Sequence, residues 1–237
     1  MNYFIWNGVD SRAMGLIVGQ LPPIERAPER AEQVTIPGKA GAVTFLEGED
    51  IYEPILRECT VYAINDGSYR ASLPWLRGGG TVVFSNEPDR QYFARIMEGV
   101  KFEAEGNSLR EATIPFLCEP YKGQWPPESR VTIDNDDTVT VYNPGDVPAK
   151  PIIYMPNIDG EATITINGEI YTFFHDNETQ GCLLDAESGI LSIGTEYSAT
   201  IFVPQMNGLP VLKKGNNTVT VGGFTDAIVI EPRWRWV

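Results

Sequence analysis

The stretch Thr163-Ile164-Thr165-Ile166-Asn167-Gly168-Glu169-Ile170-Tyr171-Thr172 is the clearest structural signal in the chain. Apolar and polar residues alternate on both sides of Asn167-Gly168, as they do in two half-buried β-strands. Asn-Gly is favoured in two-residue hairpin turns because both turn residues must adopt a positive φ. The stretch therefore predicts a β-hairpin with its turn at Asn167-Gly168.

Short strand-like runs continue on both sides of this hairpin. The turn Asp185-Ala186-Glu187-Ser188-Gly189 joins another pair of runs, and no helical period interrupts them. This pattern favours an antiparallel β-sandwich of jelly-roll type. The predicted strands are 138–142, 152–155, 162–166, 169–174, 182–185, 190–193, 197–203, 218–221 and 227–230.

A change in composition at Cys118–Pro127 predicts a linker, because this stretch holds three prolines and one glycine. A chain of 237 residues is long enough for two modest domains. We therefore expect a first domain over residues 1–127 and a β-sandwich over residues 128–237. The fold class predicted for the whole chain is mainly β.

The first domain is expected to hold strands and one short helix. The predicted strands are 3–6, 16–18, 56–63, 81–85, 91–97 and 112–117. The helix is predicted over Ser68–Arg77, with Ser68 as its cap and Gly78-Gly79-Gly80 ending it. Pro74 weakens that prediction, because a proline inside a helix removes a backbone hydrogen bond.

The segment Leu21–Pro54 is rich in proline and charge, yet it contains two short β-runs. Gln33–Ile36 and Ala42–Leu46 flank the turn Pro37-Gly38-Lys39-Ala40-Gly41. One interpretation is a hairpin that projects from the domain and packs on a neighbour, because a lone hairpin cannot bury both of its faces. The other interpretation is an irregular surface loop.

Composition argues against several functional classes. Lys and Arg number 18 against 32 Asp and Glu, a net charge of −14, whereas proteins that bind nucleic acid or anionic membranes need clustered cations.

The chain has no visible signal peptide, and its longest uncharged stretch falls short of the ~18 apolar residues of a spanning helix. Cys59, Cys118 and Cys182 fit neither a disulfide framework nor a zinc site. We expect a soluble protein made in a reducing compartment.

No motif points to an enzyme. His175 is the single histidine, so paired-histidine mechanisms and His-based metal sites are excluded. A nucleophile formed by Cys118 or Cys182 with His175 has no local signature. Gly38–Gly41 lacks the spacing of a phosphate loop, and Asp134–Asp137 lacks the Gly and Glu of a calcium loop. The sequence predicts no catalytic, metal-binding or cofactor-binding residues.

A carbohydrate-binding sandwich is the alternative function. Phe173-Phe174-His175-Asp176-Asn177 offers aromatic and polar groups on one strand end, and Trp234 and Trp236 lie near the C-terminus. These aromatic residues also suit core packing.

Taken in order, several segments resemble the distal tail protein (Dit) family of long non-contractile-tailed bacteriophages. They are Gly15–Val18, Ile36–Gly41, Trp75–Gly80, Thr81–Arg95, Ile114–Tyr121, Cys182–Asp185 and Ile228–Trp234. Ala40 departs from the Asp or Asn common at that position of the family's arm turn. The chain is also too short to hold the sugar-binding modules that some relatives insert.

The resemblance implies a structural virion protein of the tail tip, made in the cytoplasm of the bacterial host. Six N-terminal domains would form a ring that continues the tail tube, and a galectin-like C-terminal sandwich would dock baseplate or receptor-binding proteins. The other implied partners are the tail tube protein and the tail-tip hub protein. The candidate inter-subunit arm residues are Ile36, Pro37, Gly38, Lys39, Gly41 and Phe45.

A ring needs a heterologous interface that closes, and the arm is the natural segment to form it. An acid-rich lumen would let DNA pass without specific binding, because it repels phosphate. The two functions that the sequence leaves open are this ring-forming scaffold and the carbohydrate-binding sandwich.

Overall fold

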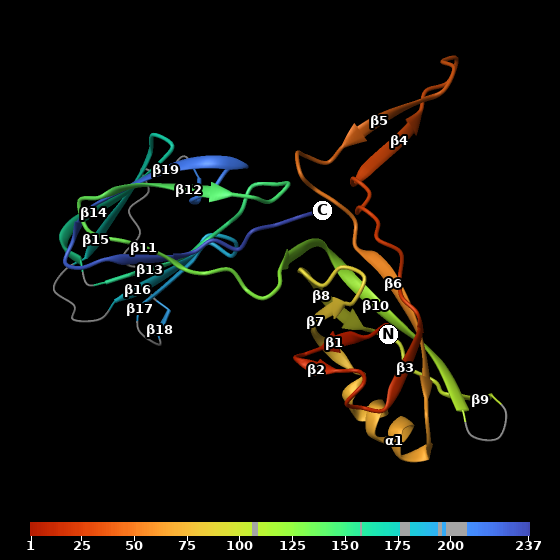
Figure 1. Cartoon of the computed structure of the whole chain (residues 1–237). Coiled ribbons are helices and arrows are strands. Elements are labelled where there is room, and N and C mark those ends of the chain that lie inside the picture. The colour runs from red at the N-terminus through yellow and green to blue at the C-terminus, as the bar shows by residue number, and fades with distance from the viewer. Residues whose placement is uncertain (106–108, 157, 176–180, 194–195, 198–207) are drawn as a thin grey trace. The chain divides into compact units, whose positions relative to one another are not determined.

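The computed structural model describes residues 1–237 apart from 106–108, 157, 176–180, 194–195 and 198–207 (Figure 1). The chain divides into two compact units, Met1–Pro126 with Val237 and Pro127–Trp236. Among the described residues α1 (Asp66–Trp75) is the only helix, and the strand pairs are antiparallel. The predicted fold class, mainly β with one short helix, is confirmed.

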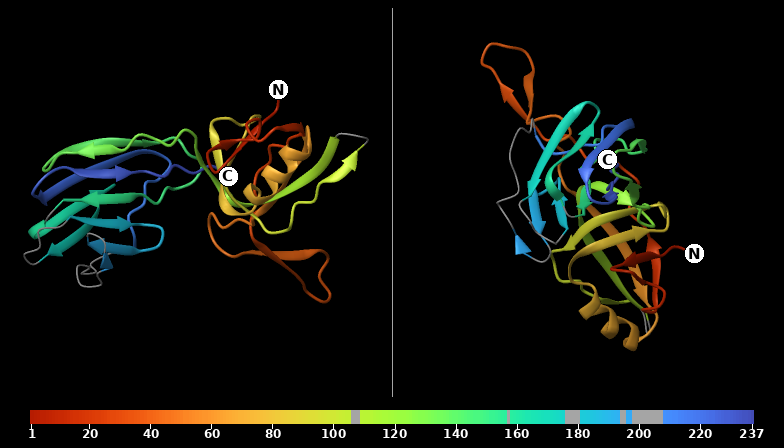
Figure 2. Two further views of the ribbon diagram at one scale, coloured as in Figure 1. Left: turned by 90° about the horizontal axis from the view of Figure 1, so that it is seen from below. Right: turned by 90° about the vertical axis from the view of Figure 1, so that its left-hand side faces the viewer.

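Most of the first unit is one curled sheet with the strand order β2-β1-β7-β8-β10-β6-β3, and β9 pairs with β10 beside β8 (Figures 1 and 2). A separate hairpin is formed by β4 and β5. The strands are β1 (Phe4–Trp6), β2 (Val9–Asp10), β3 (Leu16–Gln20), β4 (Ala31–Thr35), β5 (Ala42–Leu46), β6 (Ile55–Ala63), β7 (Gly78–Phe84), β8 (Arg90–Ile96), β9 (Glu103–Glu105) and β10 (Leu109–Gln124).

Alternation along these strands places the core of the first unit on one face of the sheet. In β6, Arg57, Cys59, Val61 and Ala63 are buried while the residues between them are more exposed. Aromatic rings fill the centre, where Phe116 packs against Phe4, Trp6 and Phe84 at centroid distances of 5.4–5.6 Å. The opposite face of the sheet is left outside this core.

The helix cap predicted at Ser68 is wrong. Asn65 has extended backbone dihedrals and its Oδ1 accepts a hydrogen bond from the Ser68 N–H at 2.9 Å, so Asn65 caps α1. Gly78–Gly80 also do more than end the helix, because they begin β7. Gly80 is needed there because the Asn7 side chain, which accepts from the Thr81 N–H, occupies the space of a Cβ.

The linker predicted over Cys118–Pro127 is wrong for most of its length. β10 continues to Gln124, with a bulge between Cys118 and Lys122 in its pairing with β8. Pro120 lies inside this bulge, where the ladder requires no N–H from it. A proline and a glycine therefore do not interrupt the strand.

The second unit is a β-sandwich. One sheet has the order β11-β20-β13-β16-β17-β18 and the other β12-β19-β14-β15, and a single apolar core of residues from both sheets joins them. The strands are β11 (Val131–Ile133), β12 (Thr138–Asn143), β13 (Ile152–Met155), β14 (Ile158–Ile166), β15 (Glu169–His175), β16 (Cys182–Asp185), β17 (Ile190–Ile193), β18 (Glu196–Tyr197), β19 (Gly215–Phe224) and β20 (Ile228–Glu231).

The predicted Asn167-Gly168 hairpin is confirmed. β14 and β15 pair from Gly160↔His175 to Ile166↔Glu169, and the two turn residues have φ of 52° and 88°. β11 was not predicted, because three residues give too short a pattern. Most of the strand predicted over 197–203 lies outside the described residues. Within the described chain, no helix combines the length and apolarity of a membrane-crossing segment.

Candidate functional site

The hairpin arm, defined as β4, β5 and the turn between them, stands clear of the curled sheet (Figures 1 and 2). Its pairing runs from Ala31↔Leu46 to Thr35↔Ala42, which confirms the hairpin and rules out the irregular loop. Every residue from 31 to 42 is exposed. A two-stranded hairpin without further strands or a packed face is only marginally stable in water when it is isolated.

One side of the arm is largely apolar. Glu32 pairs with Phe45 and Val34 with Val43, and residues that face each other or lie two apart share a side of the ribbon. Val34 is 38% exposed and Phe45 55% exposed. We call Glu32, Val34, Val43 and Phe45 the arm face. Only Phe45 belongs to the residues predicted from sequence, although alternation within the two runs also indicated Val34 and Val43.

The tip of the arm is a tight turn in which two positions have a positive φ, and both are glycine. The Lys39 N–H donates to the Ile36 carbonyl at 3.1 Å, with Pro37 and Gly38 in the two central positions. Gly38 has a φ of 83°, which fits the third position of a type II turn. Gly41 also has a positive φ, 80°. Lys39 is exposed at this tip. The predicted arm residues thus lie together, as the turn and one side of the hairpin.

At the base of the arm, the segment that precedes β4 contacts the segment that follows β5. Arg30 forms ion pairs with Glu53 at 3.0 Å and Glu47 at 3.6 Å, and its N–H donates to the Ile51 carbonyl at 2.9 Å. Farther in, the buried ring of Tyr52 packs edge-on against Tyr121 of β10 at 5.9 Å. These contacts fix where the hairpin leaves the sheet.

Arg57 holds the segment that leads into the arm. Its side chain extends from β6 with Nη1 donating to the Pro23 carbonyl at 2.7 Å and Nη2 to the Glu25 carbonyl at 3.0 Å. The guanidinium lies 4.5 Å above the Tyr92 ring, and the residue is only 2% exposed. A buried cation that bonds to backbone carbonyls is a rigid tether, because any displacement leaves its donors without partners.

The tether belongs to a small buried polar cluster. The Tyr92 hydroxyl donates to Glu87, and Lys122 Nζ donates to Glu87 Oε1 at 3.1 Å. Burial and the hydrogen bond to Glu87 raise the pKa of Tyr92 well above its usual value, so its hydroxyl stays protonated. The Glu87 carboxylate thus pairs with Lys122, whereas the Arg57 guanidinium is held by the two backbone carbonyls and the Tyr92 ring.

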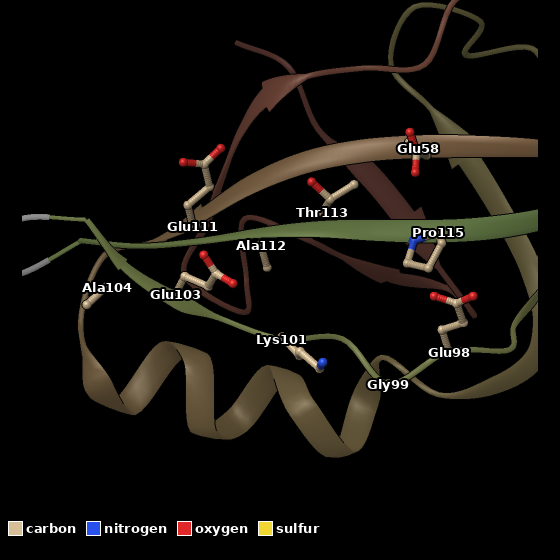
Figure 3. A pocket seen from close by; sticks show the side chains of 10 residues that line it. All are labelled: Glu58, Glu98, Gly99, Lys101, Glu103, Ala104, Glu111, Ala112, Thr113 and Pro115. Carbon is tan, nitrogen blue, oxygen red and sulfur yellow. The ribbon is translucent and has the colours of Figure 1, made fainter.

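A hollow of about 650 Å³ lies on the same unit, on the face of the sheet opposite the core (Figure 3). It forms where the segment between β8 and β9 leaves the edge of β10, beside Pro115, which has no N–H to pair there. We call it the acidic hollow. Its lining residues are Glu58, Glu98, Gly99, Lys101, Glu103, Ala104, Glu111, Ala112, Thr113 and Pro115.

The structure places most of the residues that were considered for chemistry. No group of three or more His, Cys, Asp or Glu residues there could hold a metal ion. Cys59, Cys118 and Cys182 are buried free thiols, and burial raises the pKa of Cys118 to about 12. The side chain of His175 lies outside the described residues. Asp134–Asp137 form a turn, closed by the Asp137 N–H to the Asp134 carbonyl at 3.2 Å.

The two tryptophans considered for sugar binding pack in or against the core of the second unit and do not form an exposed platform. Trp234 is buried in the core of the second unit at 7% exposure, and Trp236 packs against that core. The side chains of Phe174 and His175 and the residues Asp176 and Asn177 lie outside the described part of the structure. An exposed stacking surface at Trp234 is therefore excluded.

Comparison with solved structures gives a likeness over the full length. No model of a protein family matches the chain. No curated protein matches it either. Among solved structures it is similar to the Dit protein of phage SPP1, described as a paradigm of the hub adsorption apparatus in phages that infect Gram-positive bacteria. The identity is 18%, the TM-score is 0.76, and the match covers 100% of both chains.

At this identity the likeness establishes a shared fold. The resemblance to the distal tail protein family found in the sequence is confirmed at that level, across both units.

Proposed function

We propose that this chain is a structural protein of a phage tail tip, in which six copies form a ring between the tail tube and the tip hub. The observation that carries the proposal is the hairpin arm, an exposed ribbon with an apolar face, in a chain that shares the Dit fold over its full length. A heterologous contact made by such an arm generates a ring when its rotation closes.

The other parts of the proposal follow from the same assignment. The first unit would make the ring and contact the tail tube protein and the hub protein. The β-sandwich, a galectin-like platform, would dock receptor-binding or baseplate proteins. DNA would pass through the lumen without specific binding, which the net charge of −14 supports. The proposal assigns the chain no catalytic role and no membrane contact.

The test is the solution mass of the purified chain by light scattering, with negative-stain imaging of the same peak. We expect rings of six times 26.3 kDa, about 158 kDa, or twice that mass. A chain that remains at 26.3 kDa at every concentration would contradict the proposal. Glycan binding by that monomer would instead favour the carbohydrate-binding alternative.

The arm is tested with a matched pair of double variants. Val34→Ser with Phe45→Ser removes apolar groups from the arm face, whereas Gln33→Ser with Thr44→Ser changes the opposite side of the same strands. The first pair should shift the mass toward the monomer and the second should leave the ring intact. Equal effects of both pairs would show that the arm face is not the contact.

A further inference from the structure

The strand β12 lies at one edge of its sheet in the sandwich, with β19 as its neighbour on the inner side (Figure 1). The Val221 N–H donates to the Asp137 carbonyl at 3.0 Å, so the odd-numbered residues of this strand bond to β19. Direction alternates along a strand, and the N–H and C=O groups of Thr138, Thr140 and Tyr142 therefore point outward. No strand of the described chain pairs with them there.

This edge lacks the features that keep strand edges apart. Proteins protect exposed edges with charged residues, proline, a bulge or a very short strand. The other edge strands of the sandwich follow this rule, because β11 has three residues, β18 has two, and β15 begins with Glu169. In contrast, β12 reads Thr-Val-Thr-Val-Tyr-Asn over six residues and pairs with β19 without a bulge. Its Tyr142 is 61% exposed. Such an edge is a template for a further strand.

The charges beside the two ends of β12 favour a second copy of the same strand. The acidic turn Asp134–Asp137 comes directly before β12. Lys213 and Lys214 are exposed and come directly before β19, opposite the other end of β12. Lys214 pairs with Asp146 at 3.7 Å, whereas Lys213 has no carboxylate partner among the described residues.

Antiparallel pairing of two β12 strands brings these opposite charges together at both ends of the contact. The acidic turn of each copy then lies two strand spacings, about 10 Å, from the lysines of the other. Extended Lys and Asp side chains span that distance. Parallel pairing would instead place acidic turn beside acidic turn, so charge complementarity selects the antiparallel direction.

A two-fold axis at Thr140 satisfies the outward backbone groups. Each Thr140 then exchanges hydrogen bonds with its copy, and Thr138 exchanges them with Tyr142 of the second copy. Thr-Tyr pairs form on the outer face, and Val139 lies opposite Val141 on the core side. Cross-strand pairs of β-branched and aromatic residues stabilise a sheet, and no like charges meet in this ladder.

We propose that β12 is the docking edge for β12 of a second copy of this chain, so that the two four-stranded sheets become one continuous sheet. The contact goes beyond the proposed ring and differs from it in symmetry. A two-fold contact pairs copies through identical surfaces and cannot by itself close a ring of six.

Disulfide formation by a single variant of the full chain tests this contact. Thr140→Cys places one new thiol on the proposed axis, and the three native cysteines are buried. Residues that face each other in such a ladder have Cα atoms about 5.5 Å apart, within the reach of a disulfide. Under mild oxidation Thr140→Cys should therefore form a linked dimer.

The matched control is Thr218→Cys, because Thr218 lies opposite Thr140 on β19 and is exposed on the same face. An inner strand cannot pair with another copy, so this variant should give about tenfold less linked dimer. Equal linking by the two variants, or none by Thr140→Cys, would overturn the inference.

Charge reversal tests the direction of the pairing. In the Thr140→Cys chain at low salt, Lys213→Glu alone and Asp137→Lys alone should each lower the yield of linked dimer by about threefold, and the two together should restore it. No restoration would overturn the antiparallel contact. Linked dimers from a chain that forms no rings would contradict the proposed function and leave this contact standing, whereas rings without linked dimers would do the reverse.

Discussion

At the scale of single residues, burial decides the chemistry of the three thiols. Desolvation raises the pKa of Cys59 and of Cys118 to about 12 and that of Cys182 to about 11. We expect no reaction of the folded protein with Ellman's reagent at pH 8 and three reactive thiols in guanidinium. A fast-reacting thiol in the native state would contradict the placement of that cysteine.

Asp185 gives a residue-scale prediction about pH. Burial alone would raise its pKa, but the Glu187 N–H at 2.9 Å and the Arg233 guanidinium, also at 2.9 Å, together hold the pKa below its usual 3.8. The folded state therefore binds the proton less readily than the unfolded chain, so this stabilisation is present above pH 4 and is lost as the pH falls below it.

The expected result is that Asp185→Asn lowers the free energy of unfolding of the second unit by about 1 kcal/mol at pH 7, because the charged pair is only partly buried. At pH 3 the difference from wild type should be smaller. Urea titrations of both proteins at the two pH values measure it. An equal difference at both pH values would show that the effect is not electrostatic.

At the scale of elements, the N-cap of α1 is Asn65 in the structure, whereas the sequence predicted Ser68. Asn65→Ala should destabilise the first unit by about 1 kcal/mol because it removes the acceptor of the Ser68 N–H. Asn65→Asp should keep that acceptor and cost little. Ser68→Ala should leave the cap in place. Urea unfolding ranks the three variants, and a larger cost for Ser68→Ala would reinstate Ser68 as the cap.

Elements with a clear period of two could be predicted, and elements shaped by neighbours could not. β14, β15 and the arm followed from alternation and turn residues. β10 was cut short in the prediction because Pro120 and Gly123 read as breakers, yet a bulge accommodates the proline. Gly79 and Gly80 were predicted only to end the helix, although they lie in β7 next to the side chains of Arg95 and Asn7. Such tertiary causes leave no local pattern.

The same limit applies to the candidate site. The turn Ile36–Gly41 and Phe45 could be found because their residue types are those of a hairpin with an exposed apolar group. Arg57 was missed, although it shares the period-two face of Cys59 and Val61; this alternation could have indicated a buried arginine, but not the carbonyl groups that it binds. The acidic hollow likewise leaves no local pattern, since Glu58, Glu98 and Glu111 come from segments that are distant in the sequence.

At the scale of the whole molecule, each unit holds its own apolar core. We expect residues 1–126 and 127–237 made separately to fold cooperatively, each with a melting temperature close to one of two transitions in the full chain. Calorimetry of the three proteins measures this. A fragment that lacks a cooperative transition would show that its unit depends on the other.

The length of β10 has a mechanical consequence. The strand ends at Gln124, two residues before the boundary at Pro126, so the connection to the second unit begins at the end of the β10 axis. Its hydrogen bonds to β6 and β8 run across that axis. A force directed along β10 therefore loads these hydrogen bonds in shear, all together, rather than peeling them apart one by one.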